Sequence, residues 1–445
     1  MKKLTILVLL CTLGAMMNAQ DFLTIYNQNQ ALYKTEIELE LKRGVHFYAF
    51  ENIPTGIVTE SVIFLPKDRN VALFSQSFEY DLANSQKTIE KYINKTVRLT
   101  TENETFSGTL IFYDRQNFGL LNESTKEMNI VSAAKVNNIL LSEMPADFYT
   151  KPTLRWQLSS PRDAKFKADL SYLTAGINWR ATYNVVLGKN DFALNSWVTI
   201  NNRSGKDFQN VTLKLIAGNV QTHSAITTRG RNDMVAETSM AMMAAPPTFA
   251  EREFSDFRIY TLDKPADIDN NQEKQLTLYP TKTVKFNRKY EYPVGGQNVD
   301  VLIEFKNSSA AGLGLPLPAG NVNFYEVDEK DKTNQFVGVS RINNTSINQD
   351  VSLKIGTAFD IVAETKTLES TVSGRTRSTK YEVSITNNKS EAVEIEIIRN
   401  ISSANVEILN PSITVTKKDA FTYIFKMRLA SGRSDNLTFT ERINN

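Results

Sequence analysis

The stretch TEIELELKRGVHFYAF, residues 35–50, decides the fold class of this chain. Aliphatic residues alternate with glutamates over residues 36–41, the period-two spacing that places successive side chains on opposite faces of a strand. Residues 42–44, Lys-Arg-Gly, supply a turn before a second run over residues 45–50. We predict a β-hairpin over this stretch.

The same alternation recurs along the chain, and asparagine-rich segments typical of turns separate the runs. The runs include Val211, Leu213 and Leu215; Val299, Val301, Ile303 and Phe305; Tyr381, Val383 and Ile385; Val393, Ile395 and Ile397; and Phe421, Tyr423, Phe425, Met427 and Leu429. The breaks include Asn201-Asn202, Asn343-Asn344 and Asn387-Asn388. The expected fold class is therefore all-β, with several domains built as antiparallel β-sandwiches.

Composition excludes some classes of function. The chain has 445 residues with 51 basic and 49 acidic side chains, and the two lysines near its start account for the difference. A balanced charge excludes an overall basic field for nucleic acid, so no nucleic-acid partner is expected. An apolar content of 41% is enough to fill real cores and excludes wholesale disorder.

The first residues, MKKLTILVLLCTLGAMMNAQD, have the pattern of a secretory signal peptide with cleavage after Ala19. Its apolar run of about 14 residues is shorter than the roughly 20 needed to span a bilayer, and no later segment is long enough. Cys11 is the only cysteine and lies inside the leader, where it is badly placed for lipidation. We therefore expect an exported bacterial protein, periplasmic or at the cell surface, without thiol chemistry or zinc–thiolate sites.

Composition and spacing divide the mature chain into segments. Residues 20–84 form an N-terminal β segment, and residues 85–145, opened by a short helix near 84–94, form an inserted SH3-like or Sm-like barrel with Gly108 and Gly119 at its bends. Small barrels of this kind often bind RNA, but this one lacks clustered arginines. Residues 150–361 form a β-sandwich region that contains a flexible loop over 221–257, and residues 362–445 form a separable immunoglobulin-like sandwich.

Four motifs occur in the order found in one bacterial family. They are YLTAGINWRATYNVVL (172–187), INNRSGKDFQNVTLKLIAGN (200–219), GLGLPLPAGNVNFYEVD (312–328) and IGTAFDI (355–361). From Leu154 onward the chain thus resembles the family known as DUF4139, a domain of unknown function. Residues 31–65 similarly resemble the companion amino-terminal segment, DUF4140. Ala181 and Phe208 depart from the proline and tryptophan usual in that family. The resemblance implies an extracytoplasmic β-rich protein without established catalytic residues.

Trp179 and Arg180 in the first of these motifs have two possible interpretations. Trp179 and Arg180 are either an aromatic platform beside a cation, suited to a sugar ring, or a core indole and a cross-strand partner. Alternation places Trp179 and Tyr183 on one face and Arg180 on the other, which favours the structural reading. Asp207 and Asp360 are the carboxylates of the motifs and are candidates for a glycosidase pair. His46 and His223 stand alone, so we expect no catalytic, metal or cofactor site.

These observations predict a non-catalytic interaction or scaffold module of the cell envelope with an unknown protein or glycan partner. One alternative is a carbohydrate-binding or carbohydrate-cleaving protein, which an aromatic cleft with opposed carboxylates would favour. The other is an adhesin or assembly subunit that acts by strand pairing, which a long unprotected edge strand would favour.

Overall fold

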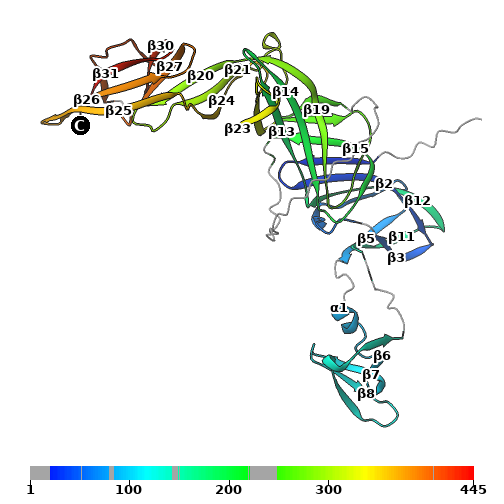
Figure 1. Ribbon diagram of the computed structural model, residues 1–445. Coiled ribbons are helices and arrows are strands. Elements are labelled where there is room, and N and C mark those ends of the chain that lie inside the picture. The colour runs from blue at the N-terminus through cyan, green and yellow to red at the C-terminus, as the bar shows by residue number, and fades with distance from the viewer. Residues whose placement is uncertain are drawn as a thin grey trace, which may run out of the picture.

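The structure is a computed structural model that describes residues 21–51, 53–79, 85–142, 149, 151–218, 220, 248–403 and 405–444. These residues form an all-β protein whose strands build six sheets around three hydrophobic cores (Figure 1). No helix in this part of the chain has the length and apolar character needed to cross a membrane. The predicted leader lies outside the described residues.

The first core lies among three sheets and one edge of a fourth. The large sheet has the strand order β16 (Phe249–Phe254), β17 (Phe257–Leu262), β15 (Phe208–Ala217), β1 (Phe22–Tyr26), β2 (Gln30–Leu41), β12 (Ala164–Ala175) and β4 (Ile63–Pro66), and β18 (Ala266–Ile268) pairs with β15. A three-stranded sheet of β3 (Gly44–Glu51), β11 (Thr153–Ser160) and β5 (Ala72–Glu79) lies beside it, with the 3₁₀ turn η1 (Thr59–Ser61) before β4. The central sheet has the order β19 (Gln272–Lys285), β14 (Asp191–Asn202), β13 (Ile177–Leu187), β22 (Gly320–Val327) and β23 (Asn334–Ile342).

The predicted hairpin over residues 35–50 is wrong. Both runs are strands, but β2 pairs with β1 and β12, whereas β3 pairs with β11 in the neighbouring sheet. Gly44, with φ +101°, turns the chain from one sheet to the other. Alternation fixes which side chains face a core, but it leaves the partner of each strand open.

The second core lies between two further sheets. The bridging sheet has the order β24 (Asp350–Thr357), β21 (Asp300–Lys306), β20 (Asn287–Pro293), β27 (Val393–Asn400), β30 (Thr422–Leu429) and β29 (Val415–Lys417). The terminal sheet has the order β25 (Ile361–Ser373), β26 (Thr376–Asn387), β31 (Arg433–Asn444) and β28 (Val406–Leu409). The core between them includes Tyr290, Tyr292 and Val299, which precede the predicted domain boundary at residue 362.

The inserted module contains α1 (Ser85–Glu90) and an open five-stranded sheet around the third core. The strand order is β10 (Asn138–Leu141), β6 (Thr96–Thr100), β7 (Thr105–Tyr113), β8 (Asn117–Leu121) and β9 (Met128–Ser132), with the 3₁₀ turn η2 (Ala133–Lys135) before β10. The expected barrel does not close, because among the described residues β9 and β10 pair only with β8 and β6. Gly119 lies within β8, and the ring of Phe112 packs over it, since a Cβ there would lie 2.2 Å from that ring.

The predicted loop over 221–257 is only partly described. Residues 221–247 lie outside the described residues, but residues 249–254 form strand β16, which pairs with β17 along its whole length. Phe249 is buried and Arg258 of β17 pairs with Glu251 of β16, while backbone pairing of β17 with β15 joins this hairpin to the rest of the large sheet. The end of the expected loop is therefore a strand.

Candidate functional site

The Trp-Arg motif lies on β13 of the central sheet. Trp179 is 3% exposed and Tyr183 is 1% exposed, and both point into the first core. The indole nitrogen of Trp179 donates to the carbonyl oxygen of Ile216 at 3.2 Å, and the Tyr183 hydroxyl donates to the carbonyl oxygen of Pro318 at 2.8 Å. Both side chains are therefore closed to a ligand as the structure stands.

Arg180 faces away from this core. Its guanidinium lies 3.1 Å from both carboxylate oxygens of Glu273 on β19, and about half of each side chain is exposed. An exposed pair of this kind contributes little stability. The arrangement gives Arg180 a partner on its own sheet and separates it from the buried indole.

The two motif carboxylates are not brought together. Asp207, in the turn before β15, accepts from the backbone nitrogen of Asn270 at 2.7 Å beside the first core. Asp360 is exposed at the start of β25 beside the second core, where its carbonyl oxygen accepts from the backbone nitrogen of Asn388. His46 is exposed on β3 and contacts the carbonyl oxygen of Arg43, and His223 lies outside the described residues. The Asp207 carboxylate and the Asp360 backbone carbonyl thus each accept a backbone hydrogen bond at separate turns.

A cleft of about 280 Å³ lies instead where the β16–β17 hairpin meets two loops of the central and bridging sheets. One wall is the hairpin turn over residues 253–258, beside Ala217 and Gly218 at the end of β15. The other wall is formed by residues 316–318, which follow the 3₁₀ turn η3 (Ser309–Ala311), and by residues 344–346 after β23. We take this cleft as the candidate functional site.

Three buried tyrosines hold the proline-rich wall in place. The hydroxyls of Tyr260 and Tyr279 both donate to the carbonyl oxygen of Pro316, at 3.3 and 2.8 Å, and Tyr183 donates to the next proline, Pro318. Burial raises the pKa of all three phenols, so they remain neutral donors. Leu317, between the two prolines, is held by two backbone hydrogen bonds to Thr345. This wall is therefore pre-organised.

The charged residues that line the cleft belong to the β16–β17 hairpin. Arg258 donates to Glu251 at 2.7 Å and lies 3.8 Å from Glu253, and the hydrogen bond to Glu251 raises the pKa of the guanidinium. The two lining carboxylates, Glu253 and Asp256, both come from this hairpin. The opposite wall is lined by Asn344, Thr345 and Ser346 in place of acids. The described residues that line this cleft therefore do not include the opposed carboxylates of a glycosidase.

Several polar groups in the cleft make no side-chain hydrogen bond or ion pair with another described residue. They are the Asp256 carboxylate, the hydroxyls of Ser255 and Ser346, and the amide nitrogen of Asn344. The amide oxygen of Asn344 is already engaged, because it accepts from the backbone nitrogen of Ala319 at 2.8 Å. Donors and acceptors are thus available together on facing walls.

Sequence reasoning missed this cleft, because its residues come from four separate segments, of which residues 217–218 and 316–318 lie in two different motifs and residues 253–260 and 344–346 lie in none. The one available signal was the pair Pro316 and Pro318, which the sequence marks as a rigid turn. Among the described residues no group of three or more His, Cys, Asp or Glu is arranged to hold a metal ion.

Comparison with known proteins identifies one family. Its model, described as "Domain of unknown function (DUF4139)", matches residues 168–444. This range contains the central, bridging and terminal sheets, and it begins after residues 31–65, whose likeness to the companion segment stays a prediction. No curated protein matches the chain.

Proposed function

This chain belongs to the DUF4139 family, and on that premise we propose that it is an exported, non-catalytic protein of the bacterial cell envelope that acts as an interaction scaffold. The proposal rests on one observation, which is that the bridging sheet contributes buried residues to both the first and the second core. On the bridging sheet, Ile303 and Leu353 are buried in the first core. Ile395 and Phe425 of the same sheet are buried in the second core.

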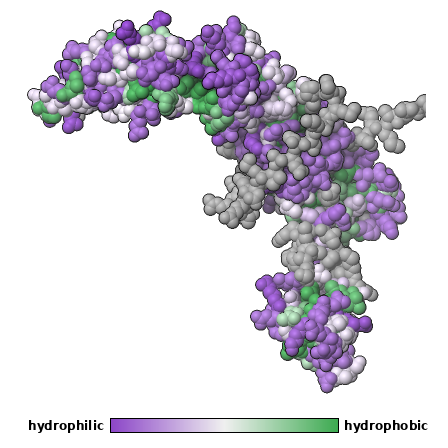
Figure 2. Space-filling view, in the orientation of Figure 1, coloured by the Kyte–Doolittle hydropathy of each residue, from purple (hydrophilic) through white to green (hydrophobic). Residues whose placement is uncertain are grey.

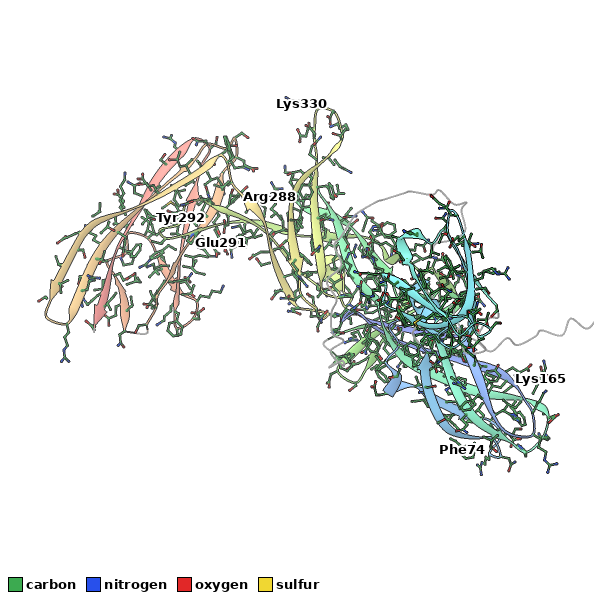
Figure 3. All side chains as sticks on the ribbon, turned by 90° about the horizontal axis from the view of Figure 1, so that it is seen from below. Phe74, Lys165, Arg288, Glu291, Tyr292 and Lys330 are labelled. Carbon is green, nitrogen blue, oxygen red and sulfur yellow. The ribbon has the colours of Figure 1, made fainter. Side chains whose placement is uncertain are left out.

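A sheet that is shared by two cores supports a rigid connection between them. Separate domains usually move relative to one another unless the contact between them is large. Here bending at the junction has to break backbone pairs between β20 and its neighbours, which join β20 to β21 over residues 287–291 and to β27 over residues 290–293. The C-terminal part extends from the first core in Figure 1, and Figure 3 shows that β20 runs from Arg288 near the junction to Tyr292 in the C-terminal part.

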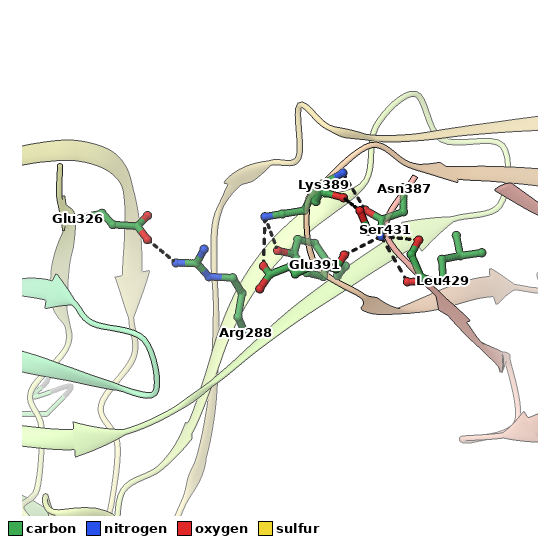
Figure 4. A network of polar contacts seen from close by, with 9 residues as sticks. Arg288, Glu326, Asn387, Lys389, Glu391, Leu429 and Ser431 are labelled. Carbon is green, nitrogen blue, oxygen red and sulfur yellow. Dashed lines mark hydrogen bonds and ion pairs between the residues drawn. The ribbon is translucent and has the colours of Figure 1, made fainter. Parts of the chain in front are cut away.

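Polar contacts reinforce the junction (Figure 4). Arg288 of β20 donates to Glu326 of β22 at 3.2 Å, which links the bridging sheet to the central sheet. Lys389 donates to the Tyr290 hydroxyl at 3.1 Å, and the buried amide of Asn387 donates to three backbone carbonyls, those of Glu391, Leu429 and Ala430. The contact of Arg288 with Glu326 therefore favours one arrangement of the two parts, and the contacts of Lys389 and Asn387 stabilise the strands around the second core.

The outer surface supports interaction more than catalysis. On the face shown in Figure 2 hydrophilic residues predominate. Glu36 and Glu38 of β2 pair with Lys167 and Lys165 of β12 at 2.7 Å in each case, and this ladder makes a charged sheet face. Among the described residues the candidate cleft offers binding groups without opposed carboxylates. Of the two carbohydrate alternatives, binding is therefore better supported than cleavage.

A second candidate, strand pairing with another chain, is favoured by β25. This strand has 13 residues, pairs only with β26 among the described strands, and forms one edge of the terminal sheet. The bond from the Asn388 nitrogen to the Asp360 oxygen marks the even-numbered residues up to Lys366 as those bonded to β26, so the odd-numbered backbone groups of residues 361–367 face outward. The register shift between Thr367 and Glu369 reverses this alternation over the rest of the strand. Glu364 and Lys366 of this strand have exposed, charged side chains. Charges of this kind disfavour pairing of an edge strand with another chain.

The proposal is tested by expressing the tagged full-length chain in a bacterial host with a photo-crosslinking residue at Lys366 or, as a control, at Lys165. A scaffold of the envelope is recovered outside the cytoplasm with Gln20 as its first residue, and it crosslinks to discrete partners. Retention of the leader with recovery in the cytoplasm would contradict the proposal. A discrete adduct from position 366 but none from position 165 would favour strand pairing.

A further inference from the structure

We propose that the cleft between the β16–β17 hairpin and the loops at Pro316 and Asn344 binds one neutral sugar unit of a saccharide. This inference goes beyond the scaffold function and does not depend on it. Ligand pockets usually measure roughly 300 to 1,000 Å³. A cleft of about 280 Å³ fits a single ring, and its open side lets a longer saccharide continue into solvent.

The hydrogen-bonding groups suit a ligand that both donates and accepts. The Asp256 carboxylate only accepts and the Asn344 amide nitrogen only donates, and both residues line the cleft together with Ser255 and Ser346, whose hydroxyls do both. Each sugar hydroxyl both donates and accepts, so one ring satisfies all of these groups. A lysine or arginine side chain only donates, and it would leave the Asn344 amide unpaired.

Charge selects a neutral sugar over an acidic one. Arg258 is the cation of the lining, and it is already paired with Glu251 and Glu253. A phosphate or uronate would meet the unpaired Asp256 without a free cation to balance it. The hairpin therefore disfavours anionic ligands.

Phe257 supplies an apolar surface beside these groups. Its half-buried ring lines the cleft and packs against Gly218, where a Cβ would lie 2.6 Å from the ring carbon Cδ1. The φ of Gly218 is +135°, a backbone conformation that residues with a side chain rarely adopt. Both this conformation and the nearby ring therefore favour glycine at this position. The aromatic ring and the C–H face of a sugar can then pack together.

The proline-rich wall of the cleft has a fixed structure in the absence of a ligand. The three tyrosine hydroxyls on Pro316 and Pro318 and the backbone pair between Leu317 and Thr345 hold it. A pre-formed wall lowers the entropy lost on binding.

Titration calorimetry on the mature full chain tests the proposal with neutral hexose and N-acetylhexosamine oligosaccharides. A polyuronate and a lysine-rich peptide serve as contrasting probes. Asp256→Asn removes the free carboxylate charge, and Asn344→Asp removes the amide donor while keeping an oxygen for the Ala319 nitrogen. Asp360→Asn is the matched control, because it is an exposed aspartate beside the other core.

We expect saturable binding of at least one neutral saccharide, with affinity reduced roughly tenfold or more by Asp256→Asn and by Asn344→Asp. Asp360→Asn should bind like the wild type, and melting temperatures of the three variants should match it. The proposal is overturned if no neutral saccharide binds, if the polyuronate or the peptide binds in its place, or if Asp256→Asn leaves affinity unchanged. Failure of the scaffold proposal would be detected in a different measurement, as independent movement of the two cores.

Discussion

The indole nitrogen of Trp179 on β13 donates a hydrogen bond of 3.2 Å to the carbonyl oxygen of Ile216 on β15. The bond crosses the first core and joins the central sheet to the large sheet, and the Trp179 ring also packs edge-on against Tyr260, 6.3 Å away between centroids. Tyr260 in turn holds the carbonyl of Pro316 at the cleft. Trp179 therefore stabilises the frame on which the cleft is built.

Trp179→Ala should lower the free energy of unfolding by about 3 to 5 kcal/mol, because it leaves a large cavity and an unpaired carbonyl at Ile216. Arg180→Ala should cost no more than about 1 kcal/mol, since its pair with Glu273 is half exposed. Urea denaturation midpoints of the two variants measure the difference. A midpoint for Trp179→Ala that equals the wild type would contradict a structural role for the indole.

Gly338→Ala should destabilise the contact between β23 and β24. A Cβ at Gly338 would lie 2.0 Å from the carbonyl oxygen of Ile355, so one of the two strands has to move, at a cost of roughly 1 to 3 kcal/mol. Gly356→Ala is the matched control on β24, because a Cβ there meets nothing within 4 Å. Thermal unfolding should show a lower melting temperature for Gly338→Ala and little change for the control. Equal effects would show that the close approach is unimportant.

Glu396 on β27 should make stability depend on pH in the acid range. Burial opposes its charge, but hydrogen bonds from Lys289 and Lys426 outweigh burial and lower the pKa of Glu396. A folded pKa below the unfolded value gives a contribution that is complete above about pH 5 and is lost as pH falls through the folded pKa.

Glu396→Gln should therefore cost roughly 1 to 3 kcal/mol at pH 7 and much less at pH 3. Urea titrations at several pH values check this, with the exposed pair of Glu364 and Lys366 as a control through Glu364→Gln. A cost for Glu396→Gln that stays constant from pH 3 to pH 7 would show that the ion pairs contribute nothing.

A fragment of residues 362–445 should fail to unfold cooperatively, although the sequence predicts a separable domain there. It lacks β20, whose Tyr292 is fully buried in the second core and whose backbone pairs with β27. A fragment of residues 287–445 should unfold cooperatively. Circular dichroism melts of both fragments check this, and a sharp transition in the shorter one would restore the boundary at residue 362.

Local patterns in the sequence predicted strands well but pairings poorly. Alternation over residues 36–41 marked the buried face of β2, since Ile37, Leu39 and Leu41 are all buried. The same pattern wrongly predicted a hairpin with β3, because pairing depends on distant segments such as β11 and β12. Residues 249–254 carry weak alternation, so their strand was missed.

The candidate site was less predictable than the fold. Asp256 and Asn344 line the same cleft only because the hairpin β16–β17 and the loop after β23 meet in space. Neither residue lies in a motif, and each is an ordinary polar residue of a turn in the sequence. Trp179, which the motif singled out, is buried and supports the site from within.

The distance between the two cores tests the scaffold proposal most directly. Spin labels on cysteines introduced at Thr283 of β19 and Thr416 of β29 report on it, because both positions are exposed and Cys11, the natural cysteine, belongs to the predicted leader. Because the bridging sheet joins the cores, pulsed electron paramagnetic resonance should give one narrow distance distribution, unchanged on warming. A broad distribution, or two populations, would mean that the cores move independently, and it would contradict a stiff scaffold.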